Sequence, residues 1–261
     1  MHSFLRERGF NSFSISATRD GKSYEIDVLF PWNDHLFVFE CKNRNLSNHH
    51  PIQSYYFRKE RDASIKQLKR QLDALAKYPD LATNAGNVDP REMKIVPVVL
   101  FGTPYSEAGS HDGVYVADWS SVSRVFTSST LKVKRPYQIH RKGRLKHEIE
   151  LYRLWADERP SPQDLVRQFN DPVQIRILES RVEKIQSIFL VDEAKYGMSE
   201  EYRRGEIKLD RLANLLDFNE ASVRKEDSLV RRGVAKLNKS LERKELINQT
   251  RSFREKKKRD S

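Results

Sequence analysis

The residues of this sequence best suited to chemistry are two carboxylates and a lysine. Asp27 lies in the apolar run 24–30, and Glu40 and Lys42 lie at the end of the apolar run 36–42. Two acidic groups placed together can hold a hard divalent cation such as Mg²⁺. A lysine beside them can orient or deprotonate a water molecule and can stabilise negative charge on a phosphate. These three residue types together therefore predict metal-assisted hydrolysis of a phosphodiester.

The two apolar runs are predicted to be strands that pair through a tight turn at 31–34. Alternate side chains of a strand share one face of the sheet. Asp27 is therefore expected on the face opposite to three apolar neighbours, Ile26, Val28 and Phe30. Glu40 and Lys42 share one face by the same rule. Pairing of the strands would then bring Asp27 beside Glu40 and Lys42.

The surrounding segments predict the elements that hold this pair of strands. Strands are expected at Phe13–Thr18, Ser23–Phe30, His35–Lys42, Lys94–Phe101 and Gly113–Ala117. Helices are expected at Ser3–Arg8, ended by Gly9, at Ala63–Ala76, and from a cap at Asp118 to Phe126. This order predicts an α/β domain with a mixed sheet.

The spacing of the three charged residues also resembles a known signature. Asp27, followed across a hairpin by Glu40-Cys41-Lys42, resembles the D…E-x-K motif of the PD-(D/E)XK nuclease superfamily. The sequences Glu-Ile-Asp-Val-Leu and Val-Phe-Glu-Cys-Lys of the two strands are similar to those of one branch of this superfamily. That branch holds Mrr-type restriction enzymes, NERD domains and archaeal Holliday-junction resolvases. The resemblance covers roughly residues 1–126. It implies a restriction-endonuclease-like fold, in which a mixed sheet is flanked by helices.

The resemblance also implies roles for individual residues. Asp27 and Glu40, with the backbone carbonyl of Cys41, would hold Mg²⁺ or Mn²⁺, and Lys42 would help to activate water. A glutamine on the following helix would complete the catalytic group. Gln67 and Gln71 lie one turn apart on that helix and either could reach in. We favour Gln67 because it comes earlier.

The beginning of the chain departs from the family pattern. The superfamily usually starts with a full helix that often carries another glutamate, whereas about eight residues precede Gly9 here. The first helix is therefore expected to be shortened, with Glu7 as a candidate for that glutamate. The side chain of Cys41 faces away from Glu40 and is expected to be a small core hydrophobe.

The charge of the chain favours an anionic partner. The sequence has 48 Lys+Arg against 37 Asp+Glu, a net charge of +11, which favours nucleic acid before membrane. Candidate DNA contacts are Arg44, Lys66, Arg70, Arg224 and Lys225. The chain lacks an apolar run of about 18 residues and an apolar leader, which predicts a cytoplasmic protein with no membrane partner. A single cysteine excludes a disulfide framework and a Cys-rich zinc site.

After Arg141 the pattern becomes longer, more charged and helical. We divide the chain into a nuclease-like domain at 1–127, a connecting helical region at 128–195 and a basic helical region at 196–261. Helices are expected to start at Ser161-Pro162 and to span Leu178–Leu190, Leu209–Leu216 and Glu220–Arg231. The last two helices and the short break between them have the spacing of a helix-turn-helix. The run Arg254–Arg259 is expected to be a disordered basic tail.

The leading hypothesis is a Mg²⁺-dependent DNA endonuclease, which the resemblance places in restriction, phage defence or repair. Two alternatives stay open. The chain could be a nucleic-acid-binding module that keeps the nuclease fold without catalysis. It could also be a protein-interaction subunit of a larger defence or repair complex. A homodimer is a further expectation, because nucleases of this kind often dimerise to cut both strands.

Overall fold

The computed structural model describes residues 1–43, 51–102, 108–139, 143–179, 182–192, 195–204, 216 and 220–259. The chain divides into two compact units. The sheet unit comprises residues 1–129 and 154–205, and the hairpin–helix unit comprises residues 130–153 and 206–261. The functional boundaries expected at 127 and 195 stay predictions. No helix among the described residues is long and apolar enough to span a membrane.

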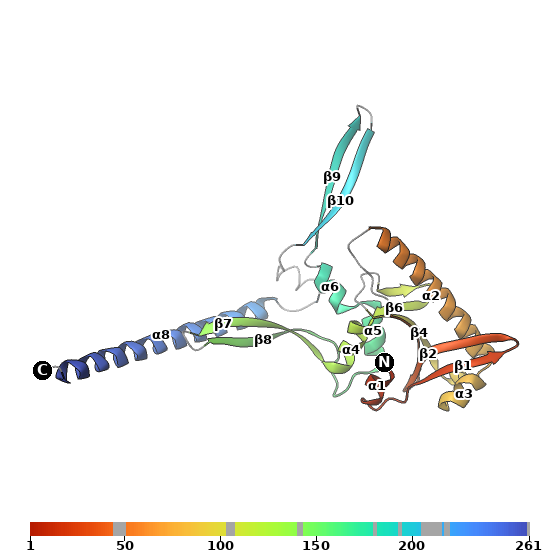
Figure 1. Cartoon of the computed structure of the whole chain (residues 1–261), viewed down its shortest axis with the longest axis horizontal. Helices are drawn as coiled ribbons and strands as arrows, with labels where there is room; N and C mark the ends of the chain where they lie inside the picture. Colours follow the sequence, from red (N-terminus) through yellow and green to blue (C-terminus); the bar gives the residue numbers. More distant parts are fainter. Residues whose placement is uncertain are drawn as a thin grey trace. The chain divides into compact units, whose positions relative to one another are not determined.

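The sheet unit is built on a mixed six-stranded sheet in the order β1-β2-β3-β4-β6-β5 (Figure 1). Its strands are β1 Phe13–Arg19, β2 Lys22–Trp32, β3 His35–Lys42, β4 Lys94–Phe101, β5 Gly109–His111 and β6 Val114–Asp118. β3, β4 and β6 run parallel to one another, and the other pairs are antiparallel. The predicted α/β class with a mixed sheet is confirmed, and β5 is an edge strand that we did not predict.

Helices cover both faces of this sheet. They are α1 His2–Arg6, α2 Pro51–Lys77, α3 Asp80–Gly86, α4 Trp119–Thr127, α5 Pro162–Asn170 and α6 Val173–Glu179, with a 3₁₀ turn η1 at Pro90–Glu92. One hydrophobic core lies between the sheet and α2, and a second lies between the sheet and α1, α4 and α5. The six-stranded sheet and these helices thus form three layers (Figure 1). α2 begins at Pro51, well before the predicted start at Ala63.

Local sequence signals explain several boundaries. Asp20 and Gly21 both have positive φ, 50° and 70°, as the two-residue turn between β1 and β2 requires. Asp118 caps α4 through its side chain, which accepts from the Ser121 backbone N–H. Ser161 caps α5 in a full capping box. Both helix starts were predicted and are confirmed.

An irregularity in β2 corrects one prediction close to the motif. The register pairs Phe13 with Leu29 and Ile15 with Ile26, so two steps along β1 match three along β2. The extra residue is a β-bulge in β2 next to Asp27. As a result Ile26 packs in the core under α2, whereas Val28 packs in the core on the other face. The prediction that Ile26 and Val28 share a face is wrong because simple alternation does not continue through a bulge.

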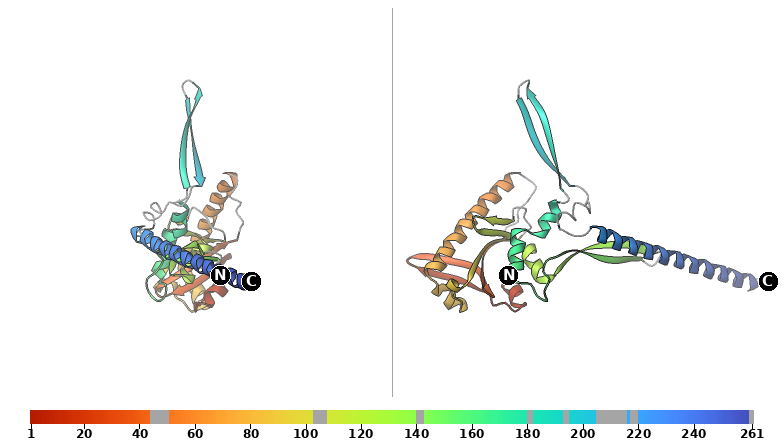
Figure 2. Two further views of the ribbon diagram at one scale, coloured as in Figure 1. Left: turned by 90° about the vertical axis from the view of Figure 1, so that its left-hand side faces the viewer. Right: turned by 180° about the vertical axis from the view of Figure 1, so that it is seen from behind.

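The hairpin–helix unit consists of β7 Thr130–Ile139, β8 Gly143–Arg153 and the helix α8 Glu220–Arg259. The β7–β8 hairpin lies along the first part of α8 in every view (Figures 1 and 2). The Tyr137 hydroxyl donates to Asp227, and Asn238 donates to the Gln138 carbonyl at 3.1 Å. The hairpin had not been predicted.

Other predictions for the second half need correction. The helix expected at Leu178–Leu190 is wrong, because α6 ends at Glu179 and β9 Val182–Asp192 pairs with β10 Lys195–Arg204. β-Branched residues are frequent in this segment, and the strand ladder satisfies its backbone. Residues 209–215 of the predicted helix-turn-helix lie outside the described residues. α8 continues to Arg259, so the segment expected to be disordered is helical.

Candidate active site

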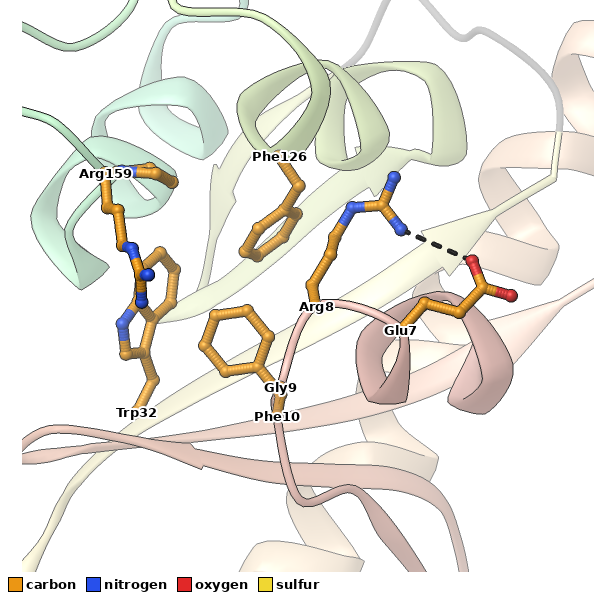
Figure 3. Close-up of a pocket in the computed structure, with 8 residues that line it drawn as sticks. Glu7, Arg8, Gly9, Phe10, Trp32, Phe126 and Arg159 are labelled. Atoms are coloured by element: carbon orange, nitrogen blue, oxygen red, sulfur yellow. Dashed lines mark ion pairs between the residues drawn. The ribbon is translucent and has the colours of Figure 1, made fainter.

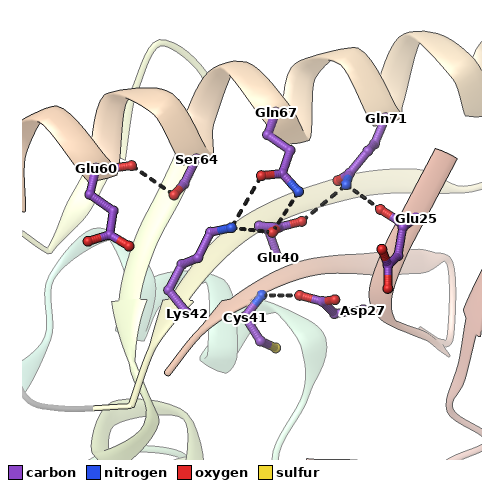
Figure 4. Close-up of polar contacts among 9 residues, drawn as sticks. All are labelled: Glu25, Asp27, Glu40, Cys41, Lys42, Glu60, Ser64, Gln67 and Gln71. Atoms are coloured by element: carbon purple, nitrogen blue, oxygen red, sulfur yellow. Dashed lines mark hydrogen bonds and ion pairs between the residues drawn. The ribbon is translucent and has the colours of Figure 1, made fainter. Parts of the chain in front are cut away.

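Glu40 is the centre of a buried polar cluster between β3 and α2 (Figure 4). Only 3% of this residue is exposed. Its Oε1 accepts from the Lys42 ammonium at 2.6 Å and from the Gln67 amide at 2.9 Å. Its Oε2 accepts from the Gln71 amide at 3.1 Å. Burial of an ionised carboxylate is costly unless it is paired, and these donors offset that cost.

Lys42 links the carboxylate to the helix. Its ammonium also donates to Gln67 Oε1 at 3.2 Å, so Lys42, Glu40 and Gln67 close a ring of three hydrogen bonds. Because the Lys42 side chain is partly exposed, the ammonium lies between the buried carboxylate and solvent. This arrangement places a fixed positive charge at the mouth of the cluster.

Asp27 joins the cluster through the backbone of β3. The β2–β3 ladder ends at the pair Val28–Phe39. The residue before Val28 is Asp27, whose Oδ2 accepts from the Cys41 backbone N–H at 2.7 Å. This side-chain oxygen takes the place that a backbone carbonyl of β2 would have in a regular ladder. The bulge in β2 directs the side chain into this gap. No hydrogen bond to Asp27 Oδ1 occurs within the described part of the chain.

Gln71 is buried and has one unsatisfied atom. Its amide nitrogen donates to Glu40 and to the Glu25 carbonyl. Its Oε1 has no hydrogen-bond partner in the described chain. The sequence left Gln67 and Gln71 as alternatives, and the structure brings both to the same carboxylate. One turn of helix separates them, so spacing alone could not distinguish one contact from two.

His2 is a contact that sequence reasoning missed. Its ring nitrogens bond to the Ser12 hydroxyl at 2.9 Å and to the Asp27 carbonyl at 3.2 Å. The imidazole therefore ties the bulge of β2 to the start of the chain. No local signal reveals this role, because the contact spans 25 residues and depends on the fold.

The donor set fits a hard cation. Among the described residues no group of three or more His, Cys, Asp and Glu side chains gathers. The acidic side chains that the hydrogen bonds place at this cluster are Asp27 and Glu40. Asp27 Oδ1 and the buried Gln71 Oε1 lack partners in the described chain, and Glu40 Oε2 has one. These are oxygen atoms, which Mg²⁺ and Mn²⁺ prefer, whereas zinc sites usually include nitrogen or sulfur. A carbonyl ligand from Cys41 stays a prediction.

The Cys41 thiol takes no part in the cluster. It packs at the edge of the core on the opposite face of β3. Burial, with a smaller contribution from the nearby Asp27 carboxylate, raises the pKa of the thiol to about 12. The group is therefore a neutral core side chain at physiological pH.

The remaining predicted site residues lie in several places. Lys66 and Arg70 are exposed on α2, the helix that carries both glutamines. Arg224 and Lys225 are exposed on α8 in the hairpin–helix unit. Arg44 lies outside the described residues. The roles of these residues in binding nucleic acid stay predictions.

Glu7, the candidate for a further acidic residue, points elsewhere. Its side chain is 72% exposed and pairs with Arg8 at 3.8 Å. It lines a separate cavity of about 410 Å³ (Figure 3). Three aromatic residues of the second core, Phe10, Trp32 and Phe126, line the same cavity. The cavity shares no residue with the cluster around Glu40, so Glu7 is not part of that cluster.

Fold and site together define a class of protein. A mixed sheet carries an aspartate beside the bulge of β2, and a glutamate and a lysine at the end of the adjacent β3, under a helix that adds glutamine, as the resemblance to PD-(D/E)XK nucleases implied. Residues 3–102 match the family model of the nuclease-related domain, NERD. Over these residues the chain matches a nuclease-related domain, which bears out the resemblance predicted from the motif. Comparisons with curated proteins and with solved structures gave no match.

Proposed function

We propose that the sheet unit is a Mg²⁺- or Mn²⁺-dependent DNA endonuclease that hydrolyses phosphodiester bonds. The observation that carries the proposal is the polar cluster around Glu40. In it Lys42 Nζ lies 2.6 Å from Glu40 Oε1 and 3.2 Å from Gln67 Oε1. The carboxylate of Asp27 accepts from the Cys41 N–H, between Glu40 and Lys42 in the sequence. The net charge of +11 supports an anionic substrate. Restriction, phage defence or repair is the proposed setting.

The residues of the cluster divide the work of such a reaction. When Mg²⁺ is bound, its contribution is to activate water and to neutralise charge at the phosphate. Asp27 and Glu40 would hold the ion through carboxylate oxygens. Lys42 would stabilise the charge that builds on the phosphate as water attacks. Gln67 fixes the position of Lys42, and Gln71 fixes the second oxygen of Glu40. The ammonium and the carboxylate are therefore already in place before the reaction begins.

A plasmid-nicking assay tests the proposal. Wild-type protein should relax supercoiled DNA with Mg²⁺ or Mn²⁺ and should stop in EDTA. Asp27→Asn and Lys42→Met should each slow nicking by at least about a hundredfold, the scale of losing one electrostatic group from a hydrolytic site. Glu92→Gln, which removes an exposed carboxylate on η1, is the matched control and should nick like wild type.

Two results would contradict the proposal. One is a wild-type protein that nicks no DNA with any divalent metal, and the other is a pair of site variants that nick as fast as wild type. Salt-sensitive binding that EDTA leaves unchanged, without nicking, would favour a non-catalytic binding module. Purification as a stable heteromer that binds no DNA alone would favour a partner subunit.

A further inference from the structure

Two tyrosines at the start of α2 are unusually exposed. Tyr55 is 63% and Tyr56 is 59% exposed, and their rings pack edge to face at a centroid distance of 5.6 Å. Among the side chains described in the six-stranded sheet and in helices α1 to α5, no other large apolar or aromatic one is as exposed. Two contiguous exposed aromatic side chains make this part of α2 a candidate surface for binding a partner or a substrate.

The tyrosines lie on the helix that supplies the glutamines of the cluster. Tyr56 and Gln67 are eleven residues apart, about three turns, so they share one face of α2. The distance between them along the axis is about 16 Å at 1.5 Å per residue. Tyr56 therefore lies about three turns before Gln67, on the face of α2 whose glutamine contacts Lys42 and Glu40.

A row of cations adjoins this face. Lys59, Lys66 and Arg70 are spaced seven and four residues apart, which places them side by side along the helix, and all three are exposed. Within the described residues none of them forms an ion pair. By contrast, two other cations of α2 are partly neutralised, Arg61 by Asp62 at 2.8 Å and Lys69 by Asp112 at 3.7 Å.

We propose that Tyr55, Tyr56, Lys59, Lys66 and Arg70, here called the α2 track, bind an unpaired stretch of the substrate strand and lead it to the cluster around Glu40. The inference rests on the proposed nuclease function and deepens it. Bases within a duplex stack on one another and offer no free face to a tyrosine, whereas unpaired bases stack on exposed aromatic rings whatever their sequence. The cations would hold the phosphates between them. The preferred substrate is then DNA with a single-stranded segment.

Binding without cleavage is the direct test. Fluorescence anisotropy in EDTA would compare the full chain on a labelled single strand of about 20 nucleotides, long enough for one binding site, and on a blunt duplex of the same sequence. Wild type should bind the single strand about tenfold or more tightly than the duplex. Tyr55→Ala/Tyr56→Ala should weaken single-strand binding by about tenfold or more, the scale of losing a stacked base, and should leave duplex binding nearly unchanged. Tyr55→Phe/Tyr56→Phe should retain wild-type affinity because stacking needs the ring.

A second variant tests the cations of the track. Lys66→Ala/Arg70→Ala should weaken single-strand binding and reduce the slope of log K against log salt by about 1.4, at roughly 0.7 for each lost phosphate contact. Arg6→Ala removes one exposed cation from α1 and is the control, which should leave affinity and slope unchanged.

The outcomes separate this inference from the nuclease proposal. The α2 track is wrong if wild type binds duplex as tightly as single strand, or if Tyr55→Ala/Tyr56→Ala binds the single strand like wild type, whatever the nicking assay gives. A protein that loses single-strand binding in these variants but nicks nothing would retain the track as a binding surface and would contradict the nuclease alone.

Discussion

The two faces of β3 carry opposite chemistry along the same eight residues. On the face under α2, Leu36 and Val38 are followed by Glu40 and Lys42. The opposite face carries no carboxylate or ammonium group and consists of the rings of His35, Phe37 and Phe39 and the thiol of Cys41. The difference shows how a polar site can be placed at the end of a buried strand: one face changes character at its last two positions, while the other keeps the strand anchored.

The anchoring face is a stack of aromatic rings. Phe30 stacks on Phe37 and Phe39 with centroid distances of 4.9 and 5.8 Å, and Phe169 of α5 packs edge-on against Phe37 and Phe39. Such ring pairs add stability beyond the area they bury. The rigidity of the polar face is therefore expected to depend on the apolar one.

Truncation of the anchoring face should give the largest effect on stability. Phe39→Ala removes a fully buried ring and should lower the free energy of unfolding by about 3–5 kcal/mol, measured by urea denaturation. Phe39→Leu keeps most of the volume and should cost less. A loss below about 1 kcal/mol for Phe39→Ala would show that the aromatic face does not anchor the strand.

Removal of the positive charge from the polar face should come next. Lys42→Met leaves the Glu40 carboxylate buried without its cation and should cost about 3 kcal/mol in the free energy of unfolding. The double variant Glu40→Gln/Lys42→Met removes both charges and should regain most of that loss. If the double variant is less stable than Lys42→Met, burial of an unpaired charge is not the cause.

A smaller effect is expected from the buried glutamine. Gln71→Leu removes donors from Glu40 Oε2 and from the Glu25 carbonyl and should cost about 2 kcal/mol in urea unfolding. Gln67→Leu should cost less, because Gln67 is partly exposed and Lys42 still pairs with Glu40. Equal losses in the two variants would contradict the asymmetry between the two glutamines.

The smallest effect concerns the thiol between the two polar residues. Burial raises the pKa of Cys41 to about 12 from an ordinary value of 9.0, so above pH 9 the unfolded chain releases this proton while the folded chain keeps it. The unfolded state then binds fewer protons, and stability falls as pH rises from about 9 to 12. The fall from this group should approach about 1.4 kcal/mol per pH unit. Urea midpoints of wild type and Cys41→Ala at about pH 8 and 10, on either side of the ordinary thiol pKa, measure this loss of stability. An equal loss in the two proteins would show that the Cys41 thiol does not cause it.

Much of the fold around the site was predictable from local patterns. His35–Lys42 and Lys94–Phe101 were predicted to the residue, because each is an apolar run bounded by turn-forming or polar residues. The helix predicted at Leu178–Leu190 is wrong because the local pattern of apolar residues there is ambiguous. Its apolar residues fit a helix and a strand about equally well, and pairing with β10 decided between them.

The candidate site was predictable to the level of residue type and face. Asp27, Glu40, Lys42 and Gln67 were expected to gather, and the structure brings them together through Cys41 and α2. The contact of Asp27 with the Cys41 N–H was not predictable, because a bulge is visible only in the register of β1 against β2. The exposed tyrosines were missed since exposure on α2 depends on what packs against it.

The sequence by itself determined which charges the chain carries and that Glu40 and Lys42 share a face, since alternation along a strand is a property of the backbone. The tertiary structure decided that Asp27 turns toward Cys41, that His2 holds the bulge and that both glutamines reach Glu40. These contacts join residues 14 to 31 positions apart. They form only when the sheet closes and α2 packs against it, because hydrogen-bond distances between elements depend on the packing of the whole core.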